Sequence, residues 1–113
     1  MALEISSEQF ARCDLVKATG RIDSQTAPQL AEALDKVMDL DRYKVVFDMS
    51  GVEFVSSAGL RVLINTQKRC QKLNRGELVL AALPERIHET LEIAGFLPLF
   101  KLEDDVLHAV GNF

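Results

Sequence analysis

Two adjacent serines, Ser56 and Ser57, carry the chemistry that this sequence offers most clearly. They follow an apolar stretch over residues 45–55, which is expected to contain a turn at Ser50-Gly51, and they begin a helix. We expect this geometry to present the Ser57 hydroxyl on the surface at the helix N-terminus. Free backbone N–H groups and the positive end of the helix dipole meet there. Because such a position accommodates a phosphate group, the pattern predicts a charge switch.

A catalytic serine is the first alternative, because hydrolases also place their nucleophile on a strand-to-helix turn, in the pattern G-x-S-x-G. Here Val55 stands two residues before Ser57 and Gly59 two residues after it, so the first glycine is missing. Neither His88 nor His108 lies where the base of a catalytic triad is implied. The glycine-rich phosphate-binding patterns are absent from the sequence as well. We therefore expect a protein that is not an enzyme and that needs no cofactor.

The simplest alternative is that the two serines only cap a helix. A cap needs just one of them. The small residues Ala58 and Gly59 leave the neighbouring hydroxyl sterically open. A glycine early in a helix costs roughly 1 kcal/mol relative to alanine. Its presence suggests that another backbone segment or a partner approaches closely at Gly59.

The cysteines and histidines do not form a pattern typical of metal sites. Cys13 and Cys70 lie far apart, without a CxxC spacing, and we expect both to be free thiols. His88 and His108 are each isolated, with no cysteine or second histidine at ligand spacing. No metal site is predicted.

Length and composition are typical of one folded domain over residues 1–113, with 48% hydrophobic and 27% charged residues. The net charge of -4 disfavours direct binding to nucleic acid, because general nucleic-acid binders are usually basic. No apolar run approaches the roughly 20 residues of a membrane-spanning helix. The first ten residues lack the basic and apolar segments of a signal peptide. We expect a cytoplasmic protein without membrane insertion.

The pattern of apolar residues predicts the elements that position the serine pair. Strands are expected over residues 3–5, 10–19 with a continuation over 21–23 after a break at Gly20, 43–47, 78–82 and 99–102. Helices are expected over 27–38, about 58–73, 84–95 and 103–110. Thr26 or Ser24 is the expected N-cap of the first helix, because Pro28 then falls in its first turn. Alternating strands and helices predict an α/β domain. We expect a four- to five-stranded mixed sheet flanked by about four helices.

Two motifs of the sequence resemble those of the STAS family, the anti-sigma factor antagonists and the related cytoplasmic domains of sulfate transporters. The first is DMSGVEFVSSAGL over residues 48–60. The second is GRIDSQTA over residues 20–27, which is similar to the family's strand-to-helix junction. The expected order of elements fits the family over essentially the full chain. Two motifs in the right order make the resemblance specific to the family and imply a STAS-like domain.

The resemblance implies that Ser57, two residues before the motif glycine, is the phosphorylated residue. Ser56 stands where stand-alone antagonists often have aspartate, so it remains the alternative acceptor. The acidic residue of the second motif maps to Asp23, which we expect beside Ser57. A phosphate adds about -1.5 to -2 charges, and we expect Asp48 to lie nearby as well. Phosphorylation should therefore weaken the binding of a partner that packs on this surface.

The resemblance further implies partner switching. The unphosphorylated protein would bind an anti-sigma factor that is itself an ATP-dependent serine kinase, which releases the sigma factor. Phosphorylation of Ser57 would separate the complex, and a PP2C-type phosphatase would restore the serine. The alternative is a STAS scaffold of a signalling complex, or the cytoplasmic subunit of a lipid or anion transporter, without a serine cycle.

The helix that follows the serine pair carries an apolar arc that is too wide for one core face. We therefore expect Leu60 and Ile64 to be partly exposed and to form the apolar part of a docking surface with Val55. If they are buried instead, alanine at either position should reduce stability rather than binding alone. The expected partner-binding residues are Asp23, Val55, Ser56, Ser57, Leu60 and Ile64.

Overall fold

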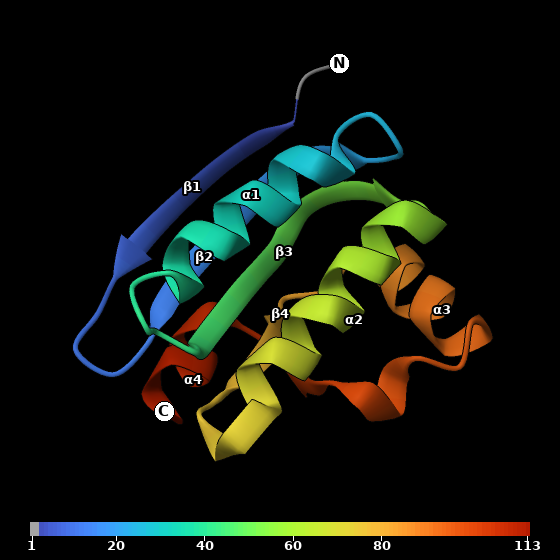
Figure 1. Ribbon diagram of the computed structural model, residues 1–113. Helices are drawn as coiled ribbons and strands as arrows, with labels where there is room; N and C mark the ends of the chain where they lie inside the picture. Colours follow the sequence, from blue (N-terminus) through green and yellow to red (C-terminus); the bar gives the residue numbers. More distant parts are fainter. Residues whose placement is uncertain (1–2) are drawn as a thin grey trace.

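The computed structural model describes residues 3–113 and contains one five-stranded mixed sheet (Figure 1). The strands lie in chain order and are β1 (Glu4–Gln9), β2 (Asp14–Ile22), β3 (Lys44–Val55), β4 (Glu77–Ala81) and β5 (Lys101–Glu103). The helices are α1 (Ala27–Met38), α2 (Ser57–Gln71), α3 (Glu85–Ile93) and α4 (Val106–Gly111), with the 3₁₀ helices η1 (Lys72–Asn74) and η2 (Leu97–Leu99). The prediction of an α/β domain with this number of strands and helices is confirmed.

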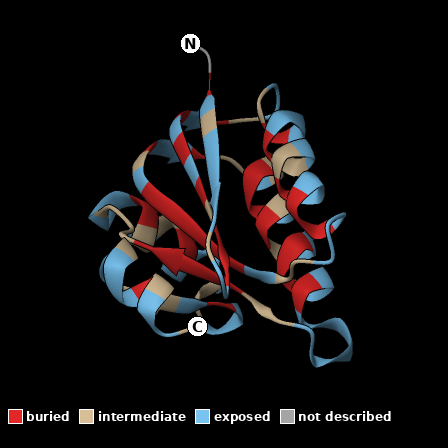
Figure 2. Cartoon of the chain, turned by 90° about the vertical axis from the view of Figure 1, so that its left-hand side faces the viewer, coloured by how far each residue is buried: buried red, intermediate tan, exposed pale blue. Residues whose placement is uncertain are grey.

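The helices form layers on both faces of the sheet. β1 is antiparallel to β2, and the other neighbouring strands are parallel. Because parallel crossovers are right-handed and the strands follow one another in order, α1, α2 and α3 cover the same face. Their buried residues Leu34, Leu63 and Ile87 join one apolar cluster with Phe47. α4 covers part of the opposite face, and Figure 2 shows the buried sides of the helices turned toward the sheet.

β3 extends well beyond β4 and carries the chain to the start of α2. It pairs with β2 as far as Ile22 and Val55, but with β4 only from Lys44 to Asp48. The predicted turn at Ser50-Gly51 is therefore wrong. The pairing of β3 with β2 shifts register twice in this region, and β3 continues as one strand. A Cβ atom on Gly51 would lie 2.8 Å from the Thr19 hydroxyl oxygen, so this glycine allows close packing on β2 rather than a reversal of the chain.

Several predicted boundaries shift by a few residues. The predicted break at Gly20 is wrong, because β2 runs through this residue, which adopts a φ of 119° within the strand. The last strand begins at Lys101 instead of residue 99, because residues 97–99 form η2. The terminal helix begins at Val106, since the Asp105 side chain accepts a hydrogen bond from the His108 backbone N–H at 2.8 Å and caps the helix there.

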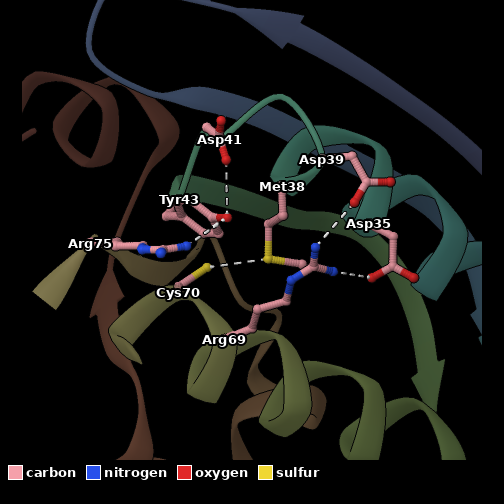
Figure 3. Close-up of polar contacts among 8 residues, drawn as sticks. All are labelled: Asp35, Met38, Asp39, Asp41, Tyr43, Arg69, Cys70 and Arg75. Atoms are coloured by element: carbon pink, nitrogen blue, oxygen red, sulfur yellow. Dashed lines mark hydrogen bonds and ion pairs between the residues drawn. The ribbon is translucent and has the colours of Figure 1, made fainter. Parts of the chain in front are cut away.

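α1 and α2 are joined by polar and sulfur contacts near their C-terminal ends (Figure 3). The Arg69 guanidinium donates to the carboxylates of Asp35 at 3.0 Å and Asp39 at 3.1 Å. Next to these ion pairs, between the same two helices, the buried Cys70 sulfur lies 3.9 Å from the Met38 sulfur. Both cysteines, Cys13 and Cys70, are buried free thiols, as predicted. Each helix of the described chain is too short or too polar to cross a membrane.

Candidate functional site

The two serines occupy different positions at the start of α2. Ser56 is the N-cap residue, with extended backbone, and its hydroxyl oxygen accepts a hydrogen bond from the Gly59 backbone N–H at 3.3 Å. Ser57 is the first residue of the helix, and its side chain is exposed. The structure therefore uses one hydroxyl to cap the helix and presents the other to solvent.

The N-terminus of α2 is fixed against the end of β2. Ile22 pairs with Val55, and the Ser56 backbone N–H donates to the Ile22 carbonyl oxygen at 2.8 Å. A Cβ atom on Gly59 would lie 2.6 Å from the Ile22 side chain and 3.3 Å from its carbonyl oxygen. The close approach predicted from Gly59 is thus made by Ile22 of the same chain. This contact holds Ser57 at the carboxyl edge of the parallel strands.

Asp23 follows Ile22 and therefore lies at the same edge as the serines. Its carboxylate accepts hydrogen bonds from the backbone N–H groups of Thr26 at 3.1 Å and Gln25 at 2.9 Å. These bonds, first that from Thr26, lower the pKa of Asp23 below its usual value. The carboxylate therefore stays charged at neutral pH beside the start of α2.

Thr26 occupies the predicted N-cap position of α1, but its hydroxyl does not cap the helix. The hydroxyl oxygen accepts from the Asp23 backbone N–H at 2.9 Å, and the hydroxyl donates to the Arg21 carbonyl oxygen at 2.8 Å. Thr26 thus closes the loop between β2 and α1. Together with the bonds to the Asp23 carboxylate, it fixes the segment that lies next to the serines.

The predicted exposure of Leu60 is wrong, and Val55, which was expected to share the docking surface, is buried as well. Val55 is 4% exposed and Leu60 is 7% exposed, and both belong to the core. Only Ile64 is partly exposed, as predicted. The reason is that α2 packs against α1, β3 and β4, so its wide apolar arc meets more than one neighbour. Val55 and Leu60 therefore support the position of Ser57 from below and are not surface contacts.

Asp48 does not lie near Ser57, contrary to the expectation from the sequence. It is buried in β3, between its register partners Lys17 and Ala81, and its carboxylate accepts from the Ser50 backbone N–H at 2.9 Å. An extended strand rises about 3.3 Å per residue, which places Asp48 roughly 20 Å from the end of β3. The acidic group at the edge with the serines is Asp23.

An exposed pair of residues lies beside the serines and was not predicted from the sequence. Phe54 is 37% exposed, and the Arg21 guanidinium carbon lies 4.3 Å from the centre of its ring. The two residues are register partners on β3 and β2. Arg21 belongs to the motif over residues 20–27 and Phe54 to the motif over residues 48–60. Each motif could be recognised in the sequence, but the contact between the two residues follows only from the pairing of β2 with β3.

An open groove adjoins this pair where β3 runs past the end of β4. Its volume is about 470 Å³. The groove has an apolar part, charged walls from two arginines and one acidic residue, and the following lining: Arg21, Val52, Glu53, Pro84, Arg86 and Ile87. Arg21 belongs both to the groove and to the pair with Phe54, so the two features form one continuous surface.

The sequence of this chain is similar to those of proteins named as anti-sigma factor antagonists. BtrV of Bordetella bronchiseptica, provisionally named an anti-sigma factor antagonist, is 38% identical over 94 residues, which cover 83% of this chain and 80% of that protein. The anti-sigma-B factor antagonist of Listeria monocytogenes is 28% identical over 112 residues, 99% of this chain and 96% of the relative.

A solved structure and a family model extend the comparison. The crystal structure of an anti-sigma factor antagonist from Mycobacterium paratuberculosis superposes with a TM-score of 0.88 at 26% identity, covering 98% of this chain and 93% of the other. The model of the STAS domain matches residues 4–109. Because this match spans nearly the whole chain and includes both motifs at the serine edge, the chain belongs to the STAS-domain family.

Proposed function

We propose that this protein is an anti-sigma factor antagonist that is switched off by phosphorylation of Ser57. The unphosphorylated form binds an anti-sigma factor with serine kinase activity in the cytoplasm, and the sigma factor is released. The kinase transfers the terminal phosphoryl group of ATP to the Ser57 oxygen, ADP leaves, and the complex separates. A PP2C-type phosphatase hydrolyses the phosphoserine ester, which restores the Ser57 hydroxyl and releases inorganic phosphate. The protein is a ligand and a substrate in this cycle, not a catalyst, and it makes no direct contact with nucleic acid.

The observation that carries the proposal is the unequal placement of the two serines. A kinase needs an accessible hydroxyl, and Ser57 is exposed while the Ser56 hydroxyl accepts the capping bond from Gly59. This difference favours Ser57 over Ser56 as the acceptor. The names of the Bordetella and Listeria relatives support the antagonist role.

Electrostatics explains the direction of the switch. A phosphate on Ser57 would lie at the N-terminus of a 15-residue helix, which stabilises negative charge, so the fold should survive. A partner packed on the same surface would have to bury a group of about -2 charges beside the charged Asp23. A loss of about 3 kcal/mol in binding free energy would weaken the complex more than a hundredfold.

Phosphorylation is tested by intact mass and peptide mapping after incubation with ATP and each of the host's ATP-binding anti-sigma factors. We expect the wild type and Ser56→Ala to gain one phosphate and Ser57→Ala to gain none. A phosphate that persists in Ser57→Ala would move the switch to another residue. If no kinase modifies the wild type, the scaffold or transporter-subunit function would replace the one proposed.

The effect on binding is tested separately by calorimetry with the same anti-sigma factor. Ser57→Asp should fold normally and bind more weakly than the wild type, because it places a carboxylate where the partner packs. Ser57→Asn is the matched control, with a similar shape and no charge, and it should bind more tightly than Ser57→Asp. Equal affinity of Ser57→Asp and the wild type would contradict the switch.

A further inference from the structure

We propose that Arg21, Phe54 and Arg86 extend the docking surface beyond Ser57 and bind an extended acidic segment of the anti-sigma factor. This inference rests on the proposed function, since it names a second region through which the same partner is recognised. The surface consists of the exposed pair Arg21 and Phe54 together with the adjoining groove, and it is called the arginine groove below.

The groove offers an extended segment a place to lie. β4 pairs with β3 only as far as Asp48, so residues 49–55 of β3 have no β4 partner beside them. The groove opens along this part of the strand, between β3 and the start of α3, where Pro84 and Arg86 line it. Peptides commonly bind by following an unpaired strand edge, with main-chain bonds for affinity and side-chain contacts for specificity. An extended chain of the partner therefore fits better than a helix.

The charges around the groove select an acidic segment. Arg21 and Arg86 line it from two different elements, β2 and α3, and both side chains are exposed. Glu53 is the acidic residue of the lining. The protein as a whole carries a net charge of -4, whereas the lining of the groove holds two arginines and one glutamate. A carboxylate of the partner would be attracted to the arginines and repelled by Glu53.

The aromatic part of the surface is already organised for binding. The Arg21 guanidinium stacks over the Phe54 ring at 4.3 Å, which limits the freedom of both side chains before a partner arrives. Less conformational entropy is then lost on association. Arginine and exposed aromatic residues are also enriched among those that contribute most to protein interfaces. Phe54 is thus an apolar contact that Val55 and Leu60, being buried, do not provide.

The arginine groove is continuous with the serine edge. Phe54 lies three residues before Ser57 on the chain, and Arg21 lies two residues before Asp23. The pair is held together by the same strand pairing that places Ile22 against Val55. A partner that covers Ser57 therefore meets Arg21 and Phe54 with little further extension.

The test is a set of single substitutions in the full chain, with affinity for the anti-sigma factor measured by calorimetry. Arg86→Gln should weaken binding about two- to fivefold, and Glu53→Gln should strengthen it by a similar factor. Phe54→Ala should weaken binding about tenfold or more. The opposite signs of the two charge changes distinguish a charged contact from general damage to the fold. The effects of Arg86→Gln and Glu53→Gln should shrink at high salt.

A matched control lies at the other end of the sheet. The Arg75 guanidinium stacks over the Tyr43 ring at 5.0 Å and donates to its hydroxyl, on a surface that Figure 3 shows beside the C-terminal end of α2. Arg75→Gln removes an equivalent exposed charge and should leave affinity unchanged.

The outcomes separate this inference from the proposed function. If the wild type binds the anti-sigma factor and the groove substitutions bind like Arg75→Gln, the arginine groove is not part of the docking surface while the antagonist role stands. If Glu53→Gln weakens binding, the occupant is not acidic, and the proposal fails. If the wild type binds none of the host's anti-sigma factors, both proposals fall together.

Discussion

The neighbouring residues Ser56 and Ser57 have different structural roles. Both the backbone and the side chain of Ser56 make hydrogen bonds that hold the chain in place, to Ile22 and from Gly59. Ser57 lies one residue further on and is exposed. A modification of Ser56 would have to give up the capping bond, whereas a modification of Ser57 would not. This division explains how one site can be rigid and still be open to an enzyme.

Replacing each serine by alanine should reveal this division in stability. Ser56→Ala removes the N-cap and should lower the free energy of unfolding by about 1 kcal/mol. Ser57→Ala removes an exposed hydroxyl and should change it by less than about 0.5 kcal/mol. Urea denaturation of the unphosphorylated proteins measures both. Equal losses for the two variants would mean that the capping bond is shared between the serines.

The positions of the site residues could be predicted from the sequence only where neighbours along the chain determine them. The placement of Ser57 at a helix start follows from the local pattern, and that placement was correct. The exposure of Leu60 and the place of Val55 on the docking surface were predicted wrongly, because burial depends on packing partners that are distant in sequence. The contact between Arg21 and Phe54 was missed for the same reason, since it requires the register of β2 and β3.

At the scale of elements, α2 is the part that links the candidate site to the rest of the fold. Gly59 allows its N-terminal turn to pack on Ile22. In its second half the polar residue Gln67 is only 3% exposed. Its amide donates to the carbonyl oxygens of Leu78 and Leu99 at 3.0 Å each, and its side-chain oxygen accepts from the Leu78 backbone N–H at 2.7 Å. α2 is therefore tied to β2, β4 and η2.

Gly59→Ala should destabilise the protein even though alanine favours helices by about 1 kcal/mol. The added methyl group would lie 2.6 Å from the Ile22 side chain and 3.0 Å from the Val55 side chain, so the first turn of α2 has to move. Overpacking of this kind costs about 1–3 kcal/mol. Thermal denaturation measures the loss. As a control, Gly111→Ala adds a methyl group with nothing within 4 Å and should not destabilise in this way. An unchanged or raised melting temperature for Gly59→Ala would contradict the close approach.

Gln67→Leu should cost about 1–3 kcal/mol in the free energy of unfolding, because it leaves the buried Leu78 N–H and two carbonyl oxygens without their partner. The exposed neighbour Gln71, on the same helix, serves as the control, and Gln71→Leu should have little effect. Urea denaturation of both variants tests the prediction. A neutral Gln67→Leu would show that apolar packing compensates fully for the lost bonds.

The elements themselves were largely predictable, because apolar periodicity is a local property. All four helices occur near their predicted positions. The continuity of β3 was not predicted, because Ser50-Gly51 resembles a turn when only the local sequence is considered. Its glycine is instead required by the Thr19 side chain of the neighbouring strand, which a pattern along one segment does not contain.

At the scale of the whole molecule, the two faces of the sheet are covered unequally. Three helices cover one face, and the short α4 covers part of the other with a smaller apolar cluster. Each face buries one cysteine, Cys70 on the larger side and Cys13 on the smaller. A buried thiol is stable in its neutral form, so the state of the whole fold is coupled to the ionisation of these two side chains.

The free energy of unfolding should therefore fall in alkaline solution. Burial raises the pKa of Cys70 from 9.0 to about 11, and burial followed by the nearby Asp14 raises that of Cys13. Because the thiolate is disfavoured only in the folded state, the contribution of Cys70 is fully present below pH 9.0 and is lost as the pH rises through about 11. Its full size is about 2–3 kcal/mol, because one pKa unit corresponds to about 1.4 kcal/mol. Urea denaturation between about pH 8 and pH 10.5 measures the decline.

Cys70→Ala separates this effect from every other effect of alkaline solution on stability. The variant starts from a lower stability, because it leaves a small cavity beside Met38, but its stability should fall less steeply above pH 9.0 than that of the wild type. The slope, not the absolute stability, is the measurement that matters, since ionisation of Cys70 can contribute only while the thiol is present. Parallel slopes for the two proteins would mean that the folded chain admits a Cys70 thiolate as readily as the unfolded chain does.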